Sequence, residues 1–323
     1  MHAIRQHELG PAENLRYEEV PDLGPAEGQV RIRVEAAGVH LIDTSIRRGG
    51  HSGAFPLPEL PTTPGREVAG TVDVVGPGVG PEWGGRRVVA HLGMANGGYA
   101  EQAVAAVGSL HVIPGHLSPE AAVAMIGTGR TALGVLERAG LTAGDVVLVT
   151  SAAGGLGTLF VQAARNVWAT AVGVAGGPEK VAQVLDNGAT VAVDHHQPDW
   201  PQRVAEALGD REVTVVLDGV GGALGRAALE LVAPGGRLVM FGFSSGQPTD
   251  LTIQDLMARS LTATWALGQP MLSRMRALET RALEEAAAGR LVPRVTSFPL
   301  AEAAAAHTAL EARATTGKVV LIP

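Results

Sequence analysis

A glycine-rich turn between an apolar run and a helical pattern carries the residue types that best fit a defined chemistry. The stretch reads DVVLVTSAAGGLGTLFVQAARN, from Asp145 to Asn166. The spacing S-x-x-G-x-x-G places small residues where a backbone must approach a phosphate closely, and the helix start offers free N–H groups and a positive dipole end. The turn therefore predicts a site for the pyrophosphate of a dinucleotide. The expected contacts are Ser151, Gly154, Gly155, Leu156 and Gly157.

A short β-branched strand before the turn and a helix over 156–167 are expected to hold it. Further strands are predicted at 171–174, 190–193, 213–217 and 237–241, with helices near 178–187, 200–208 and 222–232 between them. Alternating strands and helices predict a parallel, doubly wound sheet with right-handed crossovers. A further strand, 261–267, is expected at the edge of this sheet.

The first part of the chain, up to about residue 115, is predicted to be β-rich. Strands are expected at 3–5, 15–19, 29–37, 68–75 and 87–90, separated by Gly and Pro clusters. This pattern suggests a partly closed antiparallel barrel. A helix is expected from Ser118 to about residue 139, with a break near 126–130. The predicted division is a barrel domain over 1–118 and 268–323 and a parallel-sheet domain over 119–267.

Composition disfavours several classes of protein. The net charge of −7, without a basic cluster, disfavours binding to nucleic acid or to anionic membranes. The N-terminus lacks an apolar signal core, and no segment approaches the roughly 20 apolar residues that cross a bilayer, so a cytoplasmic protein is expected. The absence of cysteine removes disulfides, thiolate nucleophiles and every Cys-based zinc site.

Seven blocks in order along the chain carry a family pattern. They are AAGVHLIDTSIRRG (36–49), PGREVAGTVDVVGPGV (64–79), GGYAEQAV (97–104), TALGVLERAGLTAGDVVLVTSAAGGLG (131–157), VVLDGVGG (215–222), LVAPGGRLVMFGFSSG (231–246) and TGKVVLIP (316–323). Together they resemble the zinc-free branch of the medium-chain dehydrogenase/reductase superfamily, specifically the quinone oxidoreductase family. The resemblance implies a GroES-like catalytic barrel and a Rossmann domain, with substrate in the cleft between them. It also implies NADPH as hydride donor and a quinone or α,β-unsaturated carbonyl compound as substrate.

The zinc ligands of the family's zinc-dependent cousins are not matched. At the corresponding positions this chain has His40 and Arg66, and it has no thiol. His40 and Glu67 alone fall short of the three protein ligands that a catalytic zinc needs, so no metal site is expected. Without a Lewis acid, the favoured chemistry is hydride delivery to an already electrophilic carbon, with hydrogen-bond donors at the oxygen.

The end of the second Rossmann strand predicts a preference for NADPH over NADH. Gly176 lies at the turn where NAD enzymes usually place an acidic residue, and Lys180 follows one helical turn later. Resemblance places His195 near the adenosine phosphate, where relatives have Tyr, with Asp194 beside it. A solvated surface lysine is the alternative interpretation of Lys180.

By resemblance, the segment 38–48 lines the cleft beside the nicotinamide. His40 is expected to donate a hydrogen bond to the substrate oxygen or to relay a proton. Asp43 either touches substrate or holds its loop through backbone bonds. Thr44 matches the family and is expected, with His40 and Asp43, among the catalytic residues. His40 and Ser45 stand where relatives often have Asn and Tyr.

Five other positions are expected at the cofactor. Thr131 aligns with a family threonine near the carboxamide, although a helix cap is the alternative. The loop after the 237–241 strand, with Phe241, Gly242 and Phe243, is expected to line the cofactor at the carboxyl edge of the sheet. Lys318 is expected either to reach the cofactor or to end a surface strand.

The strand Leu261–Leu267 is expected at a sheet edge, where pairing with a second subunit predicts a homodimer. Two other functions remain open at this point. One is an enoyl-thioester reductase of the same superfamily, and the other is an NADPH-binding regulatory or structural protein with negligible turnover. The loop 49–63 is expected to shape the substrate pocket.

Overall fold

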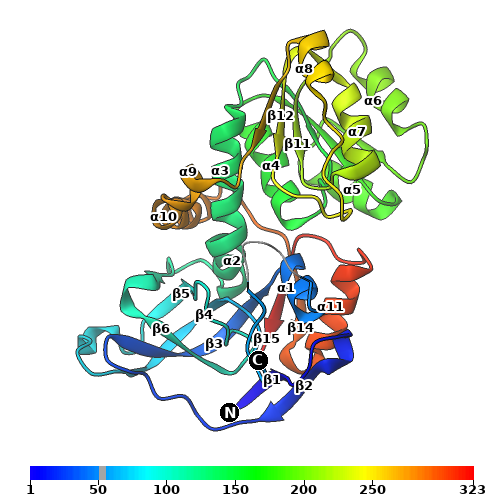
Figure 1. Ribbon diagram of the computed structural model, residues 1–323. Coiled ribbons are helices and arrows are strands. Elements are labelled where there is room, and N and C mark those ends of the chain that lie inside the picture. Colours follow the sequence, from blue (N-terminus) through cyan, green and yellow to red (C-terminus); the bar gives the residue numbers. More distant parts are fainter. Residues whose placement is uncertain (51–55) are drawn as a thin grey trace. The chain divides into compact units, whose positions relative to one another are not determined.

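The chain folds into two compact units (Figure 1). The computed structural model describes residues 1–50 and 56–323, so part of the loop predicted to shape the substrate pocket, residues 51–55, lies outside the described residues. One unit contains Met1–Gly127 and Pro293–Pro323, and the other contains Thr128–Val292. The boundaries therefore differ from those expected at 118/119 and 267/268.

The later second boundary has a packing reason. Helix α10 (Met275–Ala287) packs against α3 (Arg130–Ala139), and the Arg130 guanidinium pairs with the Glu279 carboxylate at 2.5 Å. Both charged groups are buried. The segment after residue 267 is thereby attached to the parallel-sheet unit up to Val292.

The second unit is built on six parallel strands in the order β10-β9-β8-β11-β12-β13. The strands are β8 (Val146–Val149), β9 (Thr170–Ala175), β10 (Val191–Asp194), β11 (Val213–Asp218), β12 (Val232–Met240) and β13 (Thr262–Trp265). The accompanying helices are α4 (Gly155–Asn166), α5 (Pro178–Asp186), α6 (Trp200–Leu208), α7 (Gly222–Glu230), α8 (Ile253–Arg259) and α9 (Gln269–Leu272). Renumbered within the unit, the strand order is 3-2-1-4-5-6, which confirms the predicted Rossmann sheet.

The first unit is a largely antiparallel barrel in the order β14-β15-β3-β4-β5-β7, with β6 paired to β3. Its strands are β3 (Gln29–Val39), β4 (Glu67–Val75), β5 (Arg87–His91), β6 (Gln102–Ala106), β7 (Leu110–Val112), β14 (Val295–Pro299) and β15 (Lys318–Ile322). A separate hairpin-like pair is formed by β1 (His2–Gln6) and β2 (Leu15–Glu19), and the helices are α1 (Leu41–Arg47), α2 (Pro119–Ala124) and α11 (Ala303–Glu311). This architecture confirms the expected GroES-like barrel.

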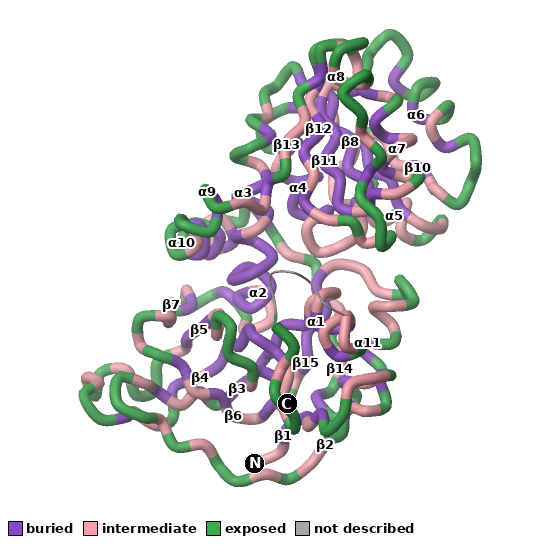
Figure 2. Tube along the Cα trace, in the orientation of Figure 1, coloured by how far each residue is buried: buried purple, intermediate pink, exposed green. Residues whose placement is uncertain are grey.

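Apolar side chains form a buried cluster in each unit. Figure 2 marks the buried residues along the chain, many of them on the strands. Strands β6, β7 and β14 were not predicted, because each has five residues or fewer and acquires its pairing from distant strands. No helix among the described residues is long and apolar enough to cross a bilayer.

The expected break near 126–130 is a π-helical turn, Met125–Gly129, that joins α2 to α3 without interrupting the helical path. Gly129 has helical dihedrals, φ −61° and ψ −47°. The chain passes from the first unit to the second within this turn, between Gly127 and Thr128. Such π turns often occur at functional sites.

Candidate functional site

The glycine-rich turn has no room for a side chain at Gly157. A Cβ added at Gly157 would lie 2.0 Å from the carbonyl oxygen of Ser151 and 2.7 Å from the Cα of Ala152. Gly154 precedes α4 in an extended conformation, and its N–H donates to the Ser151 carbonyl at 3.1 Å. The first turn of α4 starts at Gly155 and therefore presents its N–H groups beside a backbone stripped of side chains.

A buried aspartate that sequence reasoning did not single out organises the neighbouring loop. Asp218 ends β11, and its carboxylate accepts from the Thr150 hydroxyl at 2.9 Å and from the N–H groups of Val220 and Gly221 at 2.9 and 3.1 Å. Strands β8 and β11 are neighbours at the point where the strand order reverses. Ligands of such sheets bind outside the carboxyl ends of the strands at this point.

The loop after β12 divides between core and surface. Phe241 is buried, with its ring centroid 5.1 Å from that of Phe160, and a Cβ at Gly219 would meet its ring at 2.4 Å. The expectation that Phe241 lines the cofactor is therefore not supported. Gly242 lies against the Gly219 backbone, whereas Phe243 is 48% exposed and keeps a ring that a ligand can reach.

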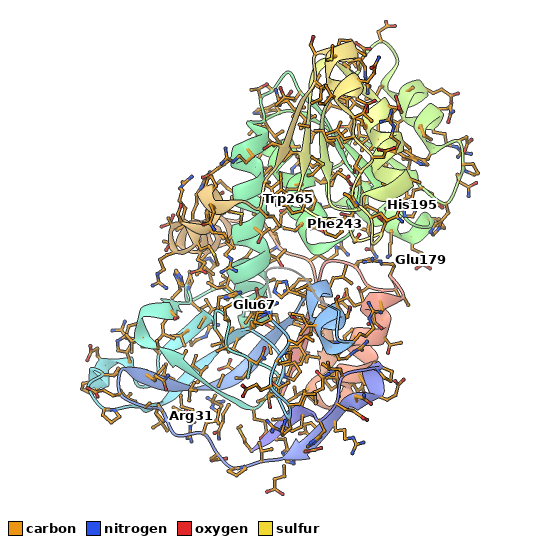
Figure 3. All side chains as sticks on the ribbon, viewed as in Figure 1. Arg31, Glu67, Glu179, His195, Phe243 and Trp265 are labelled. Carbon is orange, nitrogen blue, oxygen red and sulfur yellow. The ribbon has the colours of Figure 1, made fainter. Side chains whose placement is uncertain are left out.

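Three basic side chains gather beyond the ends of β9 and β10. A Cβ at Gly176 would lie 3.0 Å from Nε2 of both His195 and His196, whose ring centroids are 4.7 Å apart. Burial lowers the pKa of His195, and the charges of His196 and Lys180 lower it further. Figure 3 labels His195 and Glu179 in this part of the unit. We refer to Lys180, His195 and His196 as the basic cluster.

Asp194 directs one of its carboxylate oxygens, Oδ1, into the backbone of the turn. It accepts hydrogen bonds from the backbone N–H groups of Gly177 and His196 at 2.8 and 3.0 Å. These backbone bonds lower the pKa of Asp194, that of Gly177 contributing most. The carboxylate therefore holds the turn, as a structural residue would.

In the barrel unit, the ionisable side chains of His40 and Lys318 both contact the carboxylate of Glu67. His40 Nε2 lies 2.6 Å from Glu67 Oε1, and Lys318 Nζ lies 2.9 Å from Glu67 Oε2. Lys318 Nζ also lies 2.8 Å from His40 Nε2. We call these residues the His40–Glu67–Lys318 cluster; Figure 3 labels its central residue, Glu67.

The cluster is buried except at the imidazole. The side chains of Glu67 and Lys318 are 0% and 4% exposed, whereas that of His40 is 27% exposed. Burial alone would raise the pKa of Glu67, but the charges of His40 and Lys318 hold it well below its usual value. Burial lowers the pKa of Lys318 against the opposing effect of Glu67. This burial contradicts the surface-strand interpretation of Lys318, whereas contact with the cofactor stays a prediction.

Asp43 anchors the start of α1. Its carboxylate accepts from the backbone N–H of His40 at 2.8 Å, from the Arg66 guanidinium at 3.1 Å and from the Tyr99 hydroxyl at 3.1 Å. Burial alone would raise the pKa of Asp43, but the charges of His40 and Arg66 lower it. These bonds support the interpretation of Asp43 as a residue that positions His40.

The two expected threonines have different surroundings from those anticipated. Thr44 is 1% exposed, and its hydroxyl donates to the Leu41 carbonyl at 2.8 Å, so it is committed within α1. Thr131 lies inside α3, beyond the π turn, so it does not cap a helix. A direct catalytic role for Thr44 is not supported, while Thr131 is half-buried and remains a cofactor candidate.

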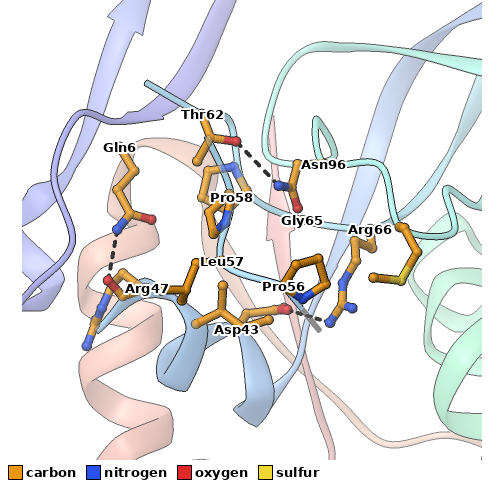
Figure 4. A pocket seen from close by; sticks show the side chains of 13 residues that line it. Gln6, Asp43, Arg47, Pro56, Leu57, Pro58, Thr62, Gly65, Arg66 and Asn96 are labelled. Carbon is orange, nitrogen blue, oxygen red and sulfur yellow. Dashed lines mark hydrogen bonds and ion pairs between the residues drawn. The ribbon is translucent and has the colours of Figure 1, made fainter. Parts of the chain in front are cut away.

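A cavity of about 90 Å³ opens beside Asp43 (Figure 4). Its lining combines the Asp43–Arg66 ion pair with the apolar side chains of Leu57 and Met94. Gln6, Arg47, Thr62 and Asn96 also line it, so the cavity offers several polar contacts beside its apolar walls.

Zinc does not fit these residues. Its two available protein ligands, His40 and Glu67, already hold the ammonium of Lys318, and Arg66 pairs with Asp43. Within residues 1–50 and 56–323, no group of three or more His, Cys, Asp and Glu side chains could hold a metal ion. We derive no step through a metal.

A GroES-like barrel unit and a Rossmann unit with a glycine-rich turn define the medium-chain dehydrogenase/reductase class. Residues 26–115 match the family model described as "Alcohol dehydrogenase GroES-like domain", and residues 155–282 match that described as "Zinc-binding dehydrogenase". The chain is 32% identical to quinone oxidoreductase 1 of Escherichia coli, with 99% of each chain covered. It belongs to the quinone oxidoreductase family, as its seven sequence blocks predicted.

Two further relatives bear on the chemistry. A 2-haloacrylate reductase from Burkholderia is 33% identical, with 98% of this chain and 97% of that protein covered. The crystal structure of Escherichia coli quinone oxidoreductase complexed with NADPH superposes with a TM-score of 0.87 at 30% identity, and all of both chains is covered.

Proposed function

We propose that this protein is a zinc-independent, NADPH-dependent reductase of quinones or α,β-unsaturated carbonyl compounds. The observation that carries the proposal is the turn at Gly157, where a Cβ would collide with the Ser151 carbonyl, at the switch point of a Rossmann sheet. The NADPH bound by the Escherichia coli relative supports the choice of cofactor. When bound, NADPH supplies the hydride.

The residues that would hold NADPH fall into two groups in the Rossmann unit. The backbone of the turn, with Ser151, Gly154, Gly155, Leu156 and Gly157, would hold the pyrophosphate. The basic cluster would hold the 2′-phosphate, because Gly176 leaves the imidazoles accessible and two backbone N–H groups offset part of the Asp194 charge. We propose Thr131, Gly242 and Phe243 as the remaining contacts.

In the barrel unit, His40 is the residue we assign to the substrate. It is the exposed member of its cluster, and Asp43 fixes its backbone. A hydrogen bond from its imidazole would stabilise the negative charge that develops on the substrate oxygen. Quinones and conjugated carbonyls both develop charge on an oxygen, and the 2-haloacrylate reductase among the relatives supports testing conjugated acids as well.

A panel assay with purified protein tests the proposal. Quinones, enones, enals and 2-haloacrylate are each followed at the NADPH absorbance band, with calorimetry of NADPH and NADH binding in parallel. We expect NADPH binding and turnover of at least one of these substrates. Tight NADPH binding without any turnover would instead identify a regulatory or structural protein.

We also propose a homodimer formed through the β13 edge. Strand β13 pairs only with β12 among the described strands, and Trp265 at its end is 46% exposed. A sheet edge with unpaired backbone groups favours pairing with a second copy. Sedimentation of a monomer at micromolar concentration would contradict this expectation.

A further inference from the structure

The contacts of the His40–Glu67–Lys318 cluster are not satisfied by ionised lysine with neutral histidine. If the Lys318 ammonium donates to Nε2 of His40, then Nε2 carries a lone pair that faces Glu67 Oε1 at 2.6 Å. If Nε2 instead carries a proton and donates it to Glu67, a charged ammonium 2.8 Å away faces an N–H group. Moving one proton from Nζ to Nε2 removes the first conflict, because Nε2–H then donates to Glu67 and the neutral amine of Lys318 faces Nε2–H with a lone pair.

Because Glu67 and Lys318 are buried, a proton can leave the cluster only through His40. Glu67 is 0% exposed and Lys318 4% exposed at their side chains, so His40 is the member that other molecules can touch. Burial lowers the pKa of Lys318, which makes its ammonium a better acid than a surface lysine. The groups that face the cluster are Asp43, Arg66 and His91.

Residue choice supports a group that releases a proton. The chain has 25 lysines and arginines together, and only two of them, Lys180 and Lys318, are lysines. A guanidinium would also neutralise Glu67, but it does not release its proton in proteins. The position that contacts both Glu67 and His40 is thus occupied by the cation that can act as an acid.

We propose that Lys318 is the proton source of the reduction and that His40 carries its proton to the substrate oxygen. The inference rests on the proposed function. As hydride from NADPH forms the new C–H bond, the π electrons of the substrate move onto oxygen. The Nδ1–H bond of His40 breaks as the O–H bond forms, and an Nζ–H bond of Lys318 breaks as an Nε2–H bond forms. A solvent proton then adds to Nδ1 and the Nε2 proton returns to Nζ, which restores the ammonium through the exposed imidazole.

The first test needs neither cofactor nor substrate. Protein labelled with ¹³C at the ε-carbon of lysine gives two signals, which Lys180→Met assigns. We expect the Lys318 signal to titrate in two coupled steps, one of which disappears in His40→Gln. If the Lys318 signal titrates in the same single step in the wild type and in His40→Gln, the proposal that Lys318 and His40 share a proton is overturned.

The second test uses the pH dependence of kcat with any substrate found in the panel. Lys318→Arg keeps a cation beside Glu67 but removes the transferable proton, and Lys318→Met removes both. We expect wild-type activity to persist above the imidazole range, and both variants to lose at least tenfold at pH 9 with the alkaline limb moved to lower pH. Alkaline limbs at the same pH in all three proteins would overturn the proposal.

The two tests separate this inference from the proposed function. Suppose that the wild-type protein turns over no substrate of the panel but Lys318 still titrates in two coupled steps. This result contradicts the proposed reductase activity and supports proton sharing between Lys318 and His40. Turnover with identical alkaline limbs contradicts Lys318 as the source while leaving the reductase supported.

Discussion

Gly127 lies directly against the carboxylate of Glu67. A Cβ at this glycine would be 1.5 Å from Glu67 Oε1. A Cβ at Gly38 would likewise be 2.3 Å from Glu67 Oε2. The π turn that contains Gly127 thus helps to enclose the cluster that we assign to proton transfer. A methyl group here has no space unless the buried carboxylate moves.

Gly127→Ala is therefore expected to destabilise the protein, even though alanine favours helices. Overpacking of this kind costs about 1–3 kcal/mol. Urea unfolding measures the change in the free energy of unfolding. Gly108→Ala is the matched control in the same unit, because a Cβ there meets nothing within 4 Å. Equal free energies of unfolding for the two variants would show that the Glu67 side chain moves aside without destabilising the protein.

Gly157→Ala should weaken NADPH binding at least tenfold, about 1.4 kcal/mol, because the new methyl group pushes α4 away from the Ser151 carbonyl. Calorimetry measures the dissociation constant. Gly144→Ala, another glycine of the same unit with open space around its Cβ position, serves as control. Unchanged affinity in Gly157→Ala would contradict the assignment of the turn to the pyrophosphate.

His195→Asn should reduce NADPH affinity and leave NADH affinity unchanged. A hydrogen bond to a charged group contributes about 1.5–3 kcal/mol, so the ratio of the two dissociation constants should change roughly 10–150-fold. Lys180→Met should act in the same direction. Arg203→Gln is a control on α6, since Arg203 pairs with Asp199 on the surface. Parallel losses for both coenzymes would show that the basic cluster does not read the 2′-phosphate.

The preference for NADPH should also weaken as pH rises. The pKa of His195 is lowered by burial, so in the free protein its imidazole is mostly neutral at pH 7. A phosphate dianion favours the protonated ring, and binding therefore takes up a proton. The NADPH dissociation constant should rise relative to that of NADH between pH 6 and pH 8. A constant ratio over this range would exclude histidine protonation from recognition.

His307 should make the barrel unit sensitive to acid. It is fully buried next to Tyr99, 3.2 Å from its hydroxyl, and burial lowers its pKa to about 4. Because the folded pKa lies below the unfolded value of about 6.5, the stabilising contribution is complete above pH 6.5 and is lost as pH falls toward 4. The loss amounts to roughly 3 kcal/mol. Unfolding of His307→Gln should show a flatter pH dependence over this window; an equally steep one would assign the effect elsewhere.

Several features could be predicted from local sequence. The glycine-rich turn at Ser151 and Gly157 was identifiable without a structure, because small residues at fixed spacing follow an apolar strand, while its contact with a pyrophosphate stays a prediction. The order of strands and helices predicted the Rossmann sheet for the same reason, since each element has its own periodicity. Helix α1 was missed, because its seven residues have no repeating apolar pattern and depend on the cap at Asp43.

The residues themselves determined that this chain has a coenzyme turn, no cysteine and two lysines. Only the tertiary structure decided what Lys318 does, because β15 and β3 pair across most of the chain and bring its ammonium to His40 and Glu67. The tertiary structure also buries Phe241, because its ring packs against Phe160 and Gly219. Spacing along the chain reports local backbone demands, whereas the charge and burial around a side chain come from residues far away in sequence.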